Sequence, residues 1–203
     1  MKHNQIAKLL LQIKAIKLNP KNPFIWSSGK KSPIYCDNRL TLSYPNIRMK
    51  IQEGLINLAK KDFMTTNLIA GVATAGIPHG ILIADKMNLP FIYVRSQEKT
   101  HGRKNKIEGE INQNKKVLIV EDLISTGKSS LNVAESLKKY GCDIIGIISI
   151  FNYNFPETKE RLKNQKIKCS SLCSFNDLIK QAELDNYISK KELDTIIHWH
   201  SEF

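Results

Sequence analysis

The sequence predicts an α/β protein with a central, mainly parallel sheet flanked by helices. From Asn67 onwards, short runs rich in Ile, Val and Leu alternate with helix-length segments. These runs are apolar at consecutive positions, as in strands that a parallel sheet buries on both faces. The chain has 203 residues, which suits one domain. We therefore expect a single domain, 1–203, with a small N-terminal helix–hairpin hood at about residues 1–43 and an α/β core with a helical tail at about residues 44–203.

The first elements precede this alternation. Apolar residues at helical spacing predict a helix over residues 4–16. Two Asn-Pro pairs then indicate a turn. Residues 24–26 and 34–36 flank the polar stretch 27–33, so we expect one hairpin with a polar tip. Apolar positions at helical spacing predict a second helix over residues 45–60.

The alternating region predicts strands and helices that follow each other closely. Gly141 occupies the place of a glycine that ends a helix. Ser189 and Glu192 have the spacing of a capping box, so we expect the last helix to begin there. The predicted strands are residues 68–72, 91–94, 117–120, 144–151 and a short one near 167–169; the predicted helices are residues 77–87 and 127–140, with two more in the tail.

The basic surplus does not predict a nucleic-acid-binding protein. The formal net charge is +12, from 31 basic and 19 acidic residues. Only five of the basic residues are Arg, the residue type that grips bases and phosphates in a bidentate way. The Lys residues are scattered along the chain, so they predict a surface that attracts anionic metabolites. We expect no nucleic-acid partner.

The chain has no predicted membrane segment. Its longest apolar run, residues 144–151, is far shorter than the roughly 20 residues that span a bilayer. The basic N-terminus lacks the apolar core and cleavage site of a signal peptide. His198 and His200 stand two residues apart and would face different sides of a helix, so we interpret them as surface residues.

The cysteines do not have the paired spacing of a metal site. We therefore expect reduced thiols and a cytoplasmic location. The four cysteines are Cys36, Cys142, Cys169 and Cys173.

Residues 117–130 are the part of the sequence that most clearly indicates chemistry. A predicted buried strand leads into two adjacent acids, Glu121 and Asp122, and a turn of small residues then opens a helix. Ligands of α/β sheets bind at the C-terminal ends of strands, and a helix N-terminus suits phosphate. This arrangement favours a sugar phosphate, although an ordinary strand–turn–helix would have a similar pattern. A P-loop is excluded, because it needs glycine where Asp122 stands.

This run, VLIVEDLISTG, resembles the phosphoribosyl pyrophosphate (PRPP) signature of type I phosphoribosyltransferases. The resemblance implies the fold of that family. It also implies that Glu121 and Asp122 hold the ribose 2′- and 3′-hydroxyls, and that the segment after them holds the 5′-phosphate. The residues of this run that it assigns to PRPP are Glu121, Asp122, Leu123, Ile124, Ser125, Thr126, Gly127, Lys128 and Ser129.

Three further segments are similar to orotate phosphoribosyltransferases. Residues 26–39 resemble the hairpin that covers the base, residues 71–78 the pyrophosphate loop and residues 95–102 the mobile catalytic loop. Their order implies transfer of the 5-phosphoribosyl group from PRPP to orotate, giving orotidine 5′-phosphate and pyrophosphate in de novo pyrimidine biosynthesis. A purine or uracil phosphoribosyltransferase is the runner-up enzyme. A regulatory module that senses PRPP and binds nucleic acid is the alternative of another class.

The resemblance also implies the roles of the loops. The pyrophosphate loop comprises Ala73, Thr74, Ala75 and Gly76. In the catalytic loop, Arg95, Lys99 and His101 would bind PRPP from the neighbouring subunit of a homodimer. Basic groups there would neutralise the departing pyrophosphate, and His101 could donate a proton. The expected catalytic residues are Lys99, His101 and Asp122. Mg²⁺ is the expected cofactor, held by PRPP and water without a protein ligand.

The orotate carboxylate is the part of the substrate without an obvious partner. Some relatives place an arginine after the strand that follows the PRPP signature, and residues 151–156 contain none. Ser125, Lys30, Lys31 and backbone N–H groups are the remaining candidates. The two lysines could equally be solvated residues of the hairpin tip. Tyr35 could stack on the base or simply pack within the hairpin.

Overall fold

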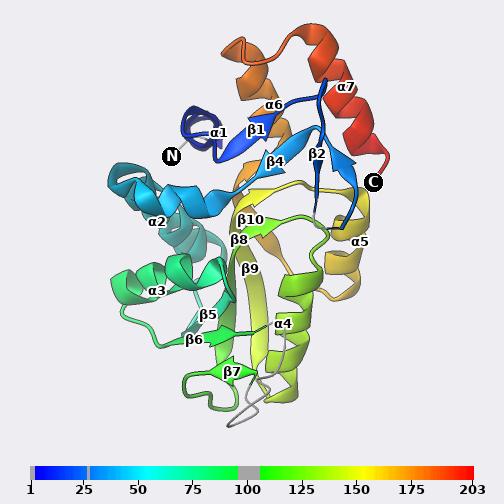
Figure 1. The fold of residues 1–203 in the computed structure, drawn as a ribbon. Coiled ribbons are helices and arrows are strands. Elements are labelled where there is room, and N and C mark those ends of the chain that lie inside the picture. Colours follow the sequence, from blue (N-terminus) through cyan, green and yellow to red (C-terminus); the bar gives the residue numbers. More distant parts are fainter. Residues whose placement is uncertain (1–2, 27, 96–105) are drawn as a thin grey trace.

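The computed structural model describes residues 3–26, 28–95 and 106–203. At its centre lies a six-stranded sheet with the order β10-β9-β8-β5-β6-β7 (Figure 1). All neighbouring strands are parallel except β7 (Ile107–Glu108), which runs antiparallel to β6 at one edge. The parallel strands are β5 (Leu68–Val72), β6 (Phe91–Val94), β8 (Lys116–Ile124), β9 (Asp143–Asn152) and β10 (Cys169–Ser174). The expected α/β class with a mainly parallel sheet is confirmed.

Helices cover both faces of this sheet. Helices α2 (Pro45–Asp62) and α3 (Gly76–Met87) lie on one face, and α4 (Lys128–Lys139) and α5 (Pro156–Asn164) lie on the other (Figure 1). Buried side chains form a separate cluster on each side of the sheet. The larger cluster continues into α1 (His3–Gln12), α6 (Phe175–Leu184) and α7 (Lys190–Ser201). The sheet is therefore buried on both faces, as its apolar strands predict.

Strand and helix boundaries agree best where the local chemistry is strongest. All five residues of β5 are buried, and this strand and β6 have the predicted bounds. Gly141 follows α4 with a φ of 78°, a backbone conformation that glycine adopts without strain. At the start of α7, Ser189 accepts the N–H of Glu192 and the Glu192 carboxylate accepts the N–H of Ser189. The predicted capping box is confirmed.

The hood differs from the single predicted hairpin. Strand β2 (Phe24–Ile25) pairs with β3 (Lys31–Ser32), whereas β4 (Ile34–Cys36) pairs with β1 (Ile16–Leu18). The backbone N–H of Trp26 donates to the Lys30 carbonyl. This bond closes a tight turn and brings β3 rather than β4 against β2. A short 3-10 helix, η1 (Asn38–Ser43), then leads into α2. The predicted pairing of residues 24–26 with 34–36 is wrong.

The first helix is also shorter than predicted. It ends at Gln12, and Lys14 adopts a left-handed φ of 57°. Ile16, expected on the helix, is instead the first residue of β1 and is fully buried there. The helical spacing of apolar residues continued across this turn by chance, because a buried strand residue and a buried helix residue look alike in sequence.

The tail contains a helix that the sequence pattern did not predict. Helix α5 begins with Pro156 in its first turn and buries only Thr158 and Leu162. Strand β10 begins at Cys169, where the predicted strand was to end.

The prediction of His200 as a surface residue is wrong. Its ring stacks 3.8 Å from that of Phe175 and its Nε2 lies 2.6 Å from the Tyr153 carbonyl, so the residue is half-buried.

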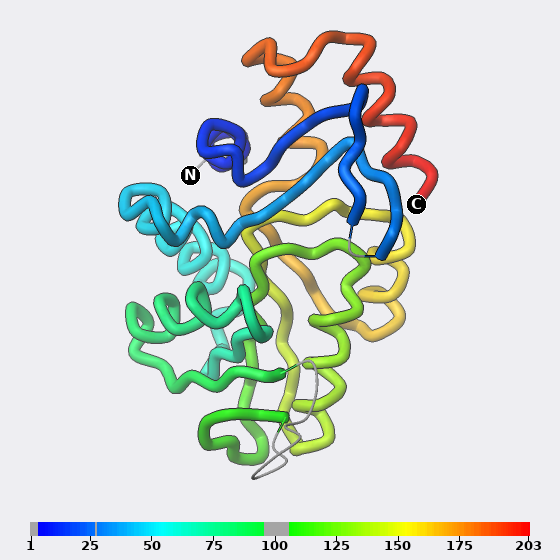
Figure 2. The backbone as a smooth tube through the Cα atoms, viewed as in Figure 1, coloured from blue at the N-terminus to red at the C-terminus, as the bar shows by residue number. Residues whose placement is uncertain are grey.

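The beginning and the end of the chain pack against each other. Figure 2 shows the hood strands beside the last helix. The Trp199 indole N–H donates to the Lys31 carbonyl at 3.1 Å, and Lys21 pairs with Glu192 at 3.3 Å. The Trp26 ring meets that of Trp199 edge to face, with centroids 5.7 Å apart.

Within the described residues, no helix is long and apolar enough to cross a membrane.

Candidate active site

The two acids of the predicted motif lie within strand β8, which is longer than predicted. Strand β5 pairs with β8 only as far as Val120, whereas β9 pairs with it as far as Ile124. Glu121 and Asp122 therefore lie on a part of β8 that projects beyond β5 at the C-terminal edge of the sheet. This is the edge at which α/β proteins bind ligands.

Burial makes these two carboxylates electrostatically unusual. Only 6% of Glu121 is exposed, and burial followed by the nearby charge of Asp122 raises its pKa well above the ordinary value. Burial also raises the pKa of Asp122. The Glu121 carboxylate accepts the N–H of Asp122 at 3.1 Å and the hydroxyl of Ser130 at 3.5 Å. Two adjacent acids with raised pKa values at a strand end are typical of a functional site.

Helix α4 starts directly behind the acids with an open N-terminus. Gly127 is its N-cap with a φ of 71°, and no side chain caps the helix within the described part of the chain. Ser125 and Thr126 are partly exposed, and Lys128 and Ser129 are exposed. The unpaired N–H groups and the positive end of the helix dipole suit a phosphate group. The predicted phosphate segment thus lies beside Asp122.

Helix α5 supports this segment from behind. The Thr158 hydroxyl donates to the Ser125 carbonyl at 2.6 Å, and Arg161 donates to the Thr126 carbonyl at 3.3 Å. A Cβ atom on Gly127 would meet the Thr158 methyl group at 3.1 Å, so the two elements are in close contact. Sequence reasoning missed both supporting residues, because they are more than 30 positions away and belong to no motif.

The predicted pyrophosphate loop lies on the other side of the acids. It joins β5 to α3 and contains a cis peptide bond between Ala73 and Thr74. A Cβ atom on Gly76 would lie 2.4 Å from the Val120 carbonyl oxygen, directly before Glu121. Only glycine permits this approach. The structure therefore brings the loop of residues 73–76 next to the two acids, as the motifs imply.

The catalytic-loop residues are described only in part. Arg95 follows β6; its N–H donates to the Lys106 carbonyl and its guanidinium lies 3.4 Å from Glu108 on β7. Residues 107 and 108 form strand β7, in which Ile107 is buried and pairs with Val94. Lys99 and His101 lie outside the described residues.

The hood residues fall into two groups. Lys30 has its Nζ 4.0 Å from the centre of the Phe203 ring, and Tyr35 lies with its ring 5.5 Å from that of Phe24. Within the described part, no hydrogen bond or ion pair joins either residue to Ser125. Asn38 does reach the acids: its side-chain amide donates to the Asp122 carbonyl at 2.8 Å. Sequence reasoning did not single out Asn38.

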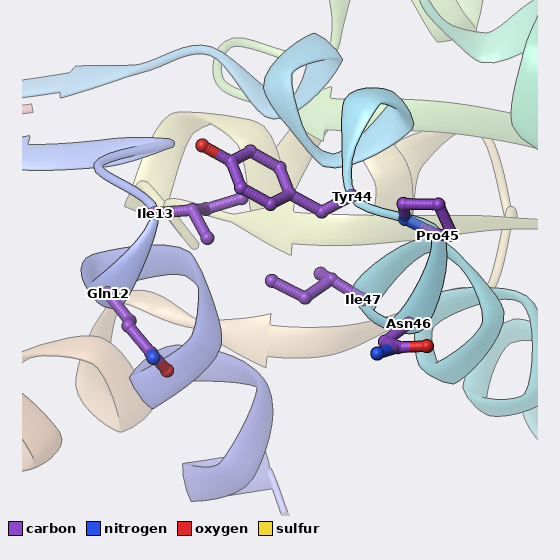
Figure 3. Close-up of a pocket in the computed structure, with 6 residues that line it drawn as sticks. All are labelled: Gln12, Ile13, Tyr44, Pro45, Asn46 and Ile47. Carbon is purple, nitrogen blue, oxygen red and sulfur yellow. The ribbon is translucent and has the colours of Figure 1, made fainter.

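A pocket of about 400 Å³ lies away from these residues. Figure 3 shows it between the end of α1 and the start of α2. None of the predicted site residues lines it. Its lining residues are Gln12, Ile13, Tyr44, Pro45, Asn46 and Ile47.

Comparisons with known proteins agree with this geometry. Residues 42–187 match the phosphoribosyl transferase domain family. Orotate phosphoribosyltransferases of Cytophaga hutchinsonii and Staphylococcus aureus are 49% and 47% identical to this chain over 195 residues. Each alignment covers 96% of this chain, with 93% and 96% of the relatives. The solved orotate phosphoribosyltransferase of Aeropyrum pernix has a TM-score of 0.78 at 24% identity, over 91% of this chain and 99% of that chain.

Proposed function

Since this chain belongs to the orotate phosphoribosyltransferases of the phosphoribosyl transferase domain family, we propose that the end of β8 and the start of α4 form its PRPP site. The chain is an enzyme that transfers the 5-phosphoribosyl group of PRPP to orotate, giving orotidine 5′-phosphate and pyrophosphate in pyrimidine biosynthesis. The observation that carries the site proposal is the position of Glu121 and Asp122 between the open end of α4 and the loop of residues 73–76.

In this proposal the acids act on the ribose. Breaking the bond between C1 and the pyrophosphate oxygen builds positive charge on the ribose ring. Glu121 and Asp122 bind the 2′- and 3′-hydroxyls through hydrogen bonds, and the negative charge of the pair stabilises the ring as its positive charge develops. Because both acids lie in a buried setting, this interaction is screened less than it would be in water. The acids therefore favour the transition state over the ground state.

The phosphate groups occupy opposite ends of the site. We assign the 5′-phosphate to the N–H groups and hydroxyls of residues 125–129 at the start of α4. Pyrophosphate lies against residues 73–76, where the close packing of Gly76 on β8 places the loop backbone. Arg95, Lys99 and His101 neutralise the departing pyrophosphate, and Leu123 and Ile124 hold the acids and the phosphate segment in line.

Orotate is assigned to the space beneath the hood. Ser125 is the first residue of the phosphate segment and is partly exposed, and we assign its hydroxyl to the base as well. Lys30 supplies a positive charge for the orotate carboxylate after leaving the Phe203 ring, and Tyr35 offers an aromatic face. Tyr35 is 38% exposed, so its ring is available for stacking.

Mg²⁺ is the proposed cofactor. Oxygen atoms are its preferred ligands, and it usually keeps several substrate and water ligands. Within the described residues, no group of three or more His, Cys, Asp and Glu side chains is arranged to hold a metal. We therefore assign the ligands of the ion to oxygen atoms of PRPP and water. When bound, the ion neutralises part of the charge on pyrophosphate.

We propose a homodimer in which the loop after Arg95 completes the site of the neighbouring subunit. Exposed apolar side chains on or next to η1, α2 and α3 support a protein interface, namely Leu40, Tyr44, Met49 and Ile81. Met49 and Ile81 belong to the adjoining helices α2 and α3, which Gln52 links by donating to the Leu82 carbonyl at 2.7 Å. Two complete sites would then require two chains.

Domain organisation and location stay predictions. One buried cluster contains residues of the hood, the sheet and the tail, from Ile6 to Ile196, which supports a single domain over residues 1–203. The four free cysteines suit the reducing cytoplasm. We propose small-molecule substrates only, with no nucleic-acid or membrane partner.

One assay tests the proposed specificity. Purified enzyme with PRPP and Mg²⁺ should consume orotate, followed by the loss of its ultraviolet absorbance, and should leave uracil, adenine and hypoxanthine unchanged. Rapid turnover of one of those bases, with orotate untouched, would replace this function with that of another phosphoribosyltransferase.

A further inference from the structure

Strand β8 loses a neighbour at the point where its acids begin. The pairing with β5 ends at the Gly71 and Val120 register, while the pairing with β9 continues to Ile124. Among the described residues, the β5 side of β8 therefore has no strand partner beside Asp122. A backbone carbonyl or N–H group that has no strand partner needs another hydrogen-bond partner to hold it.

The Asn38 side chain supplies a hydrogen bond at this point. Its amide nitrogen lies 2.8 Å from the Asp122 carbonyl oxygen, although the two residues are 84 positions apart. Asn38 begins η1, and its own carbonyl accepts the Thr41 hydroxyl at 2.6 Å. The neighbouring Asp37 N–H donates to the Ala15 carbonyl at 2.7 Å, which ties this corner to the rest of the hood. The contact therefore joins the hood directly to the acid.

The buried environment of the Asn38 side chain indicates that this residue does more than stabilise the fold. Its side chain is fully buried, yet its Oδ1 atom accepts no hydrogen bond within the described part of the chain. An unpaired buried amide oxygen lowers stability. The opposite orientation of the amide would place Oδ1 against the Asp122 carbonyl, two acceptors in contact, so the donor must face Asp122.

Charge from the same corner also acts on the acid. Burial raises the pKa of Asp122, the hydrogen bond with Glu121 opposes this, and the guanidinium of Arg39, which follows Asn38, adds a smaller lowering effect. Arg39 is itself held by Asp37, with its Nε 2.7 Å and its Nη2 2.9 Å from the two carboxylate oxygens. One short segment of the hood thus contacts the Asp122 backbone and adds positive charge near its carboxylate.

We propose that Asn38 is a positioning residue for catalysis: it holds the Asp122 backbone so that the carboxylate meets the ribose, and it couples this acid to the hood over the base. This inference rests on the proposed role of Asp122. Because Asn38 acts through Asp122, its effect on turnover should vanish once Asp122 no longer works. That dependence separates a positioning role from a merely structural one.

A double-mutant cycle tests the proposal, with kcat and the unfolding temperature measured for Asn38→Ala, Asp122→Asn and the double variant. We expect Asn38→Ala to lower kcat about tenfold in the wild type, and by less than about twofold in the Asp122→Asn background. Asn38→Asp, which keeps the shape and replaces the donor with an acceptor, should lower kcat at least as much. A tenfold loss that persists in the double variant would overturn the proposal.

Asn67→Ala is the matched control. The Asn67 Oδ1 atom accepts the Lys116 N–H at 2.8 Å, so it makes a side-chain bond of equal length at the opposite end of the same strand. Its kcat should stay normal; an equal loss in both alanine variants would overturn the proposal, as would failure of both Asn38 variants to fold. A normal kcat in Asp122→Asn alone would instead refute the proposed role of Asp122, so the two failures are seen in different variants.

Discussion

The Thr158 hydroxyl on helix α5 lies 2.6 Å from the Ser125 carbonyl oxygen and donates a hydrogen bond to it. Ser125 opens the segment to which we assign the 5′-phosphate, so α5 acts as a support behind the PRPP site. This support comes from a helix that contributes no side chain to the motif itself. Loss of this hydrogen bond should therefore change the binding of PRPP rather than the rate of the chemical step.

Thr158→Val tests this support. The change removes the hydroxyl and leaves the shape. The KM for PRPP should therefore rise by the factor that corresponds to the loss of one hydrogen bond, about 1 kcal/mol. Thr66→Val is the control, because the Thr66 hydroxyl donates to the Phe63 carbonyl at the same distance of 2.6 Å, away from the motif residues. Steady-state kinetics should show the rise only in Thr158→Val. An unchanged KM there would mean that the segment needs no support from α5.

Glu121→Gln should make the protein more stable at high pH. Burial raises the pKa of Glu121 well above its ordinary value of 4.5, so the folded chain binds this proton more tightly than the unfolded chain. The free energy of unfolding therefore falls as the pH rises from the unfolded pKa to the folded one. Removing the acid removes this loss. The unfolding temperature of the variant should exceed that of the wild type at about pH 8, and the difference should vanish near about pH 4.

Asp62→Asn provides a control of opposite sign. The Ser170 hydroxyl and then Lys168 lower the pKa of Asp62, so this acid stabilises the folded chain above its ordinary pKa of 3.8. Its loss should lower the unfolding temperature at about pH 8 and have little effect once the pH has fallen below the folded pKa. If Glu121→Gln also lowered the unfolding temperature at about pH 8, the pKa of Glu121 would not be raised in the folded chain.

Lys30→Met tests the binding of the orotate carboxylate. If the Lys30 ammonium meets that carboxylate, its loss removes a charge-assisted hydrogen bond worth about 1.5–3 kcal/mol, and the KM for orotate should rise at least tenfold. Lys168→Met is the matched control, since Lys168 also lies over a phenylalanine ring, 5.3 Å from the centre of Phe63. Equal KM values for orotate in the two variants would return Lys30 to the role of a surface residue held by Phe203.

The fold could be predicted where burial acts on consecutive residues. Strands β5 and β6 have the expected bounds because every position of β5, and most of β6, is apolar. Helix α5 was missed because its sequence, PETKERLKN, is almost entirely polar and buries two side chains. The hood pairing was missed because one backbone bond, from Trp26 to Lys30, decides which strand meets β2. No periodicity carries that information.

The candidate site divides in the same way. Glu121, Asp122 and the phosphate segment form one continuous run, so the sequence alone predicts that they lie together. Asn38 and Thr158 contact that run from 84 and 33 positions away. Both are small polar residues that occur throughout loops and helix ends, and only their place in the folded chain gives them a role.

Mixing two inactive variants tests the proposed dimer. Lys99→Ala would lack the loop cation, and Asp122→Asn would lack the acid on β8. If the loop enters the neighbouring site, a heterodimer of the two carries both defects in one site and neither in the other. The mixture should therefore regain activity as heterodimers form. Formation of heterodimers without any activity would place the loop in the site of its own chain.

The most direct test of the proposed role of Asp122 is the steady-state kinetics of Asp122→Asn, with Asp143→Asn as control. Asp143 is exposed at the start of β9, at the opposite end of the sheet from the acids. If Asp122 stabilises the ribose as positive charge builds, kcat should fall about 10²-fold or more in Asp122→Asn, with a smaller change in the KM for PRPP. Asp143→Asn should behave like the wild type. A normal kcat with a raised KM in Asp122→Asn would contradict this role, because Asp122 would then bind PRPP without assisting its reaction.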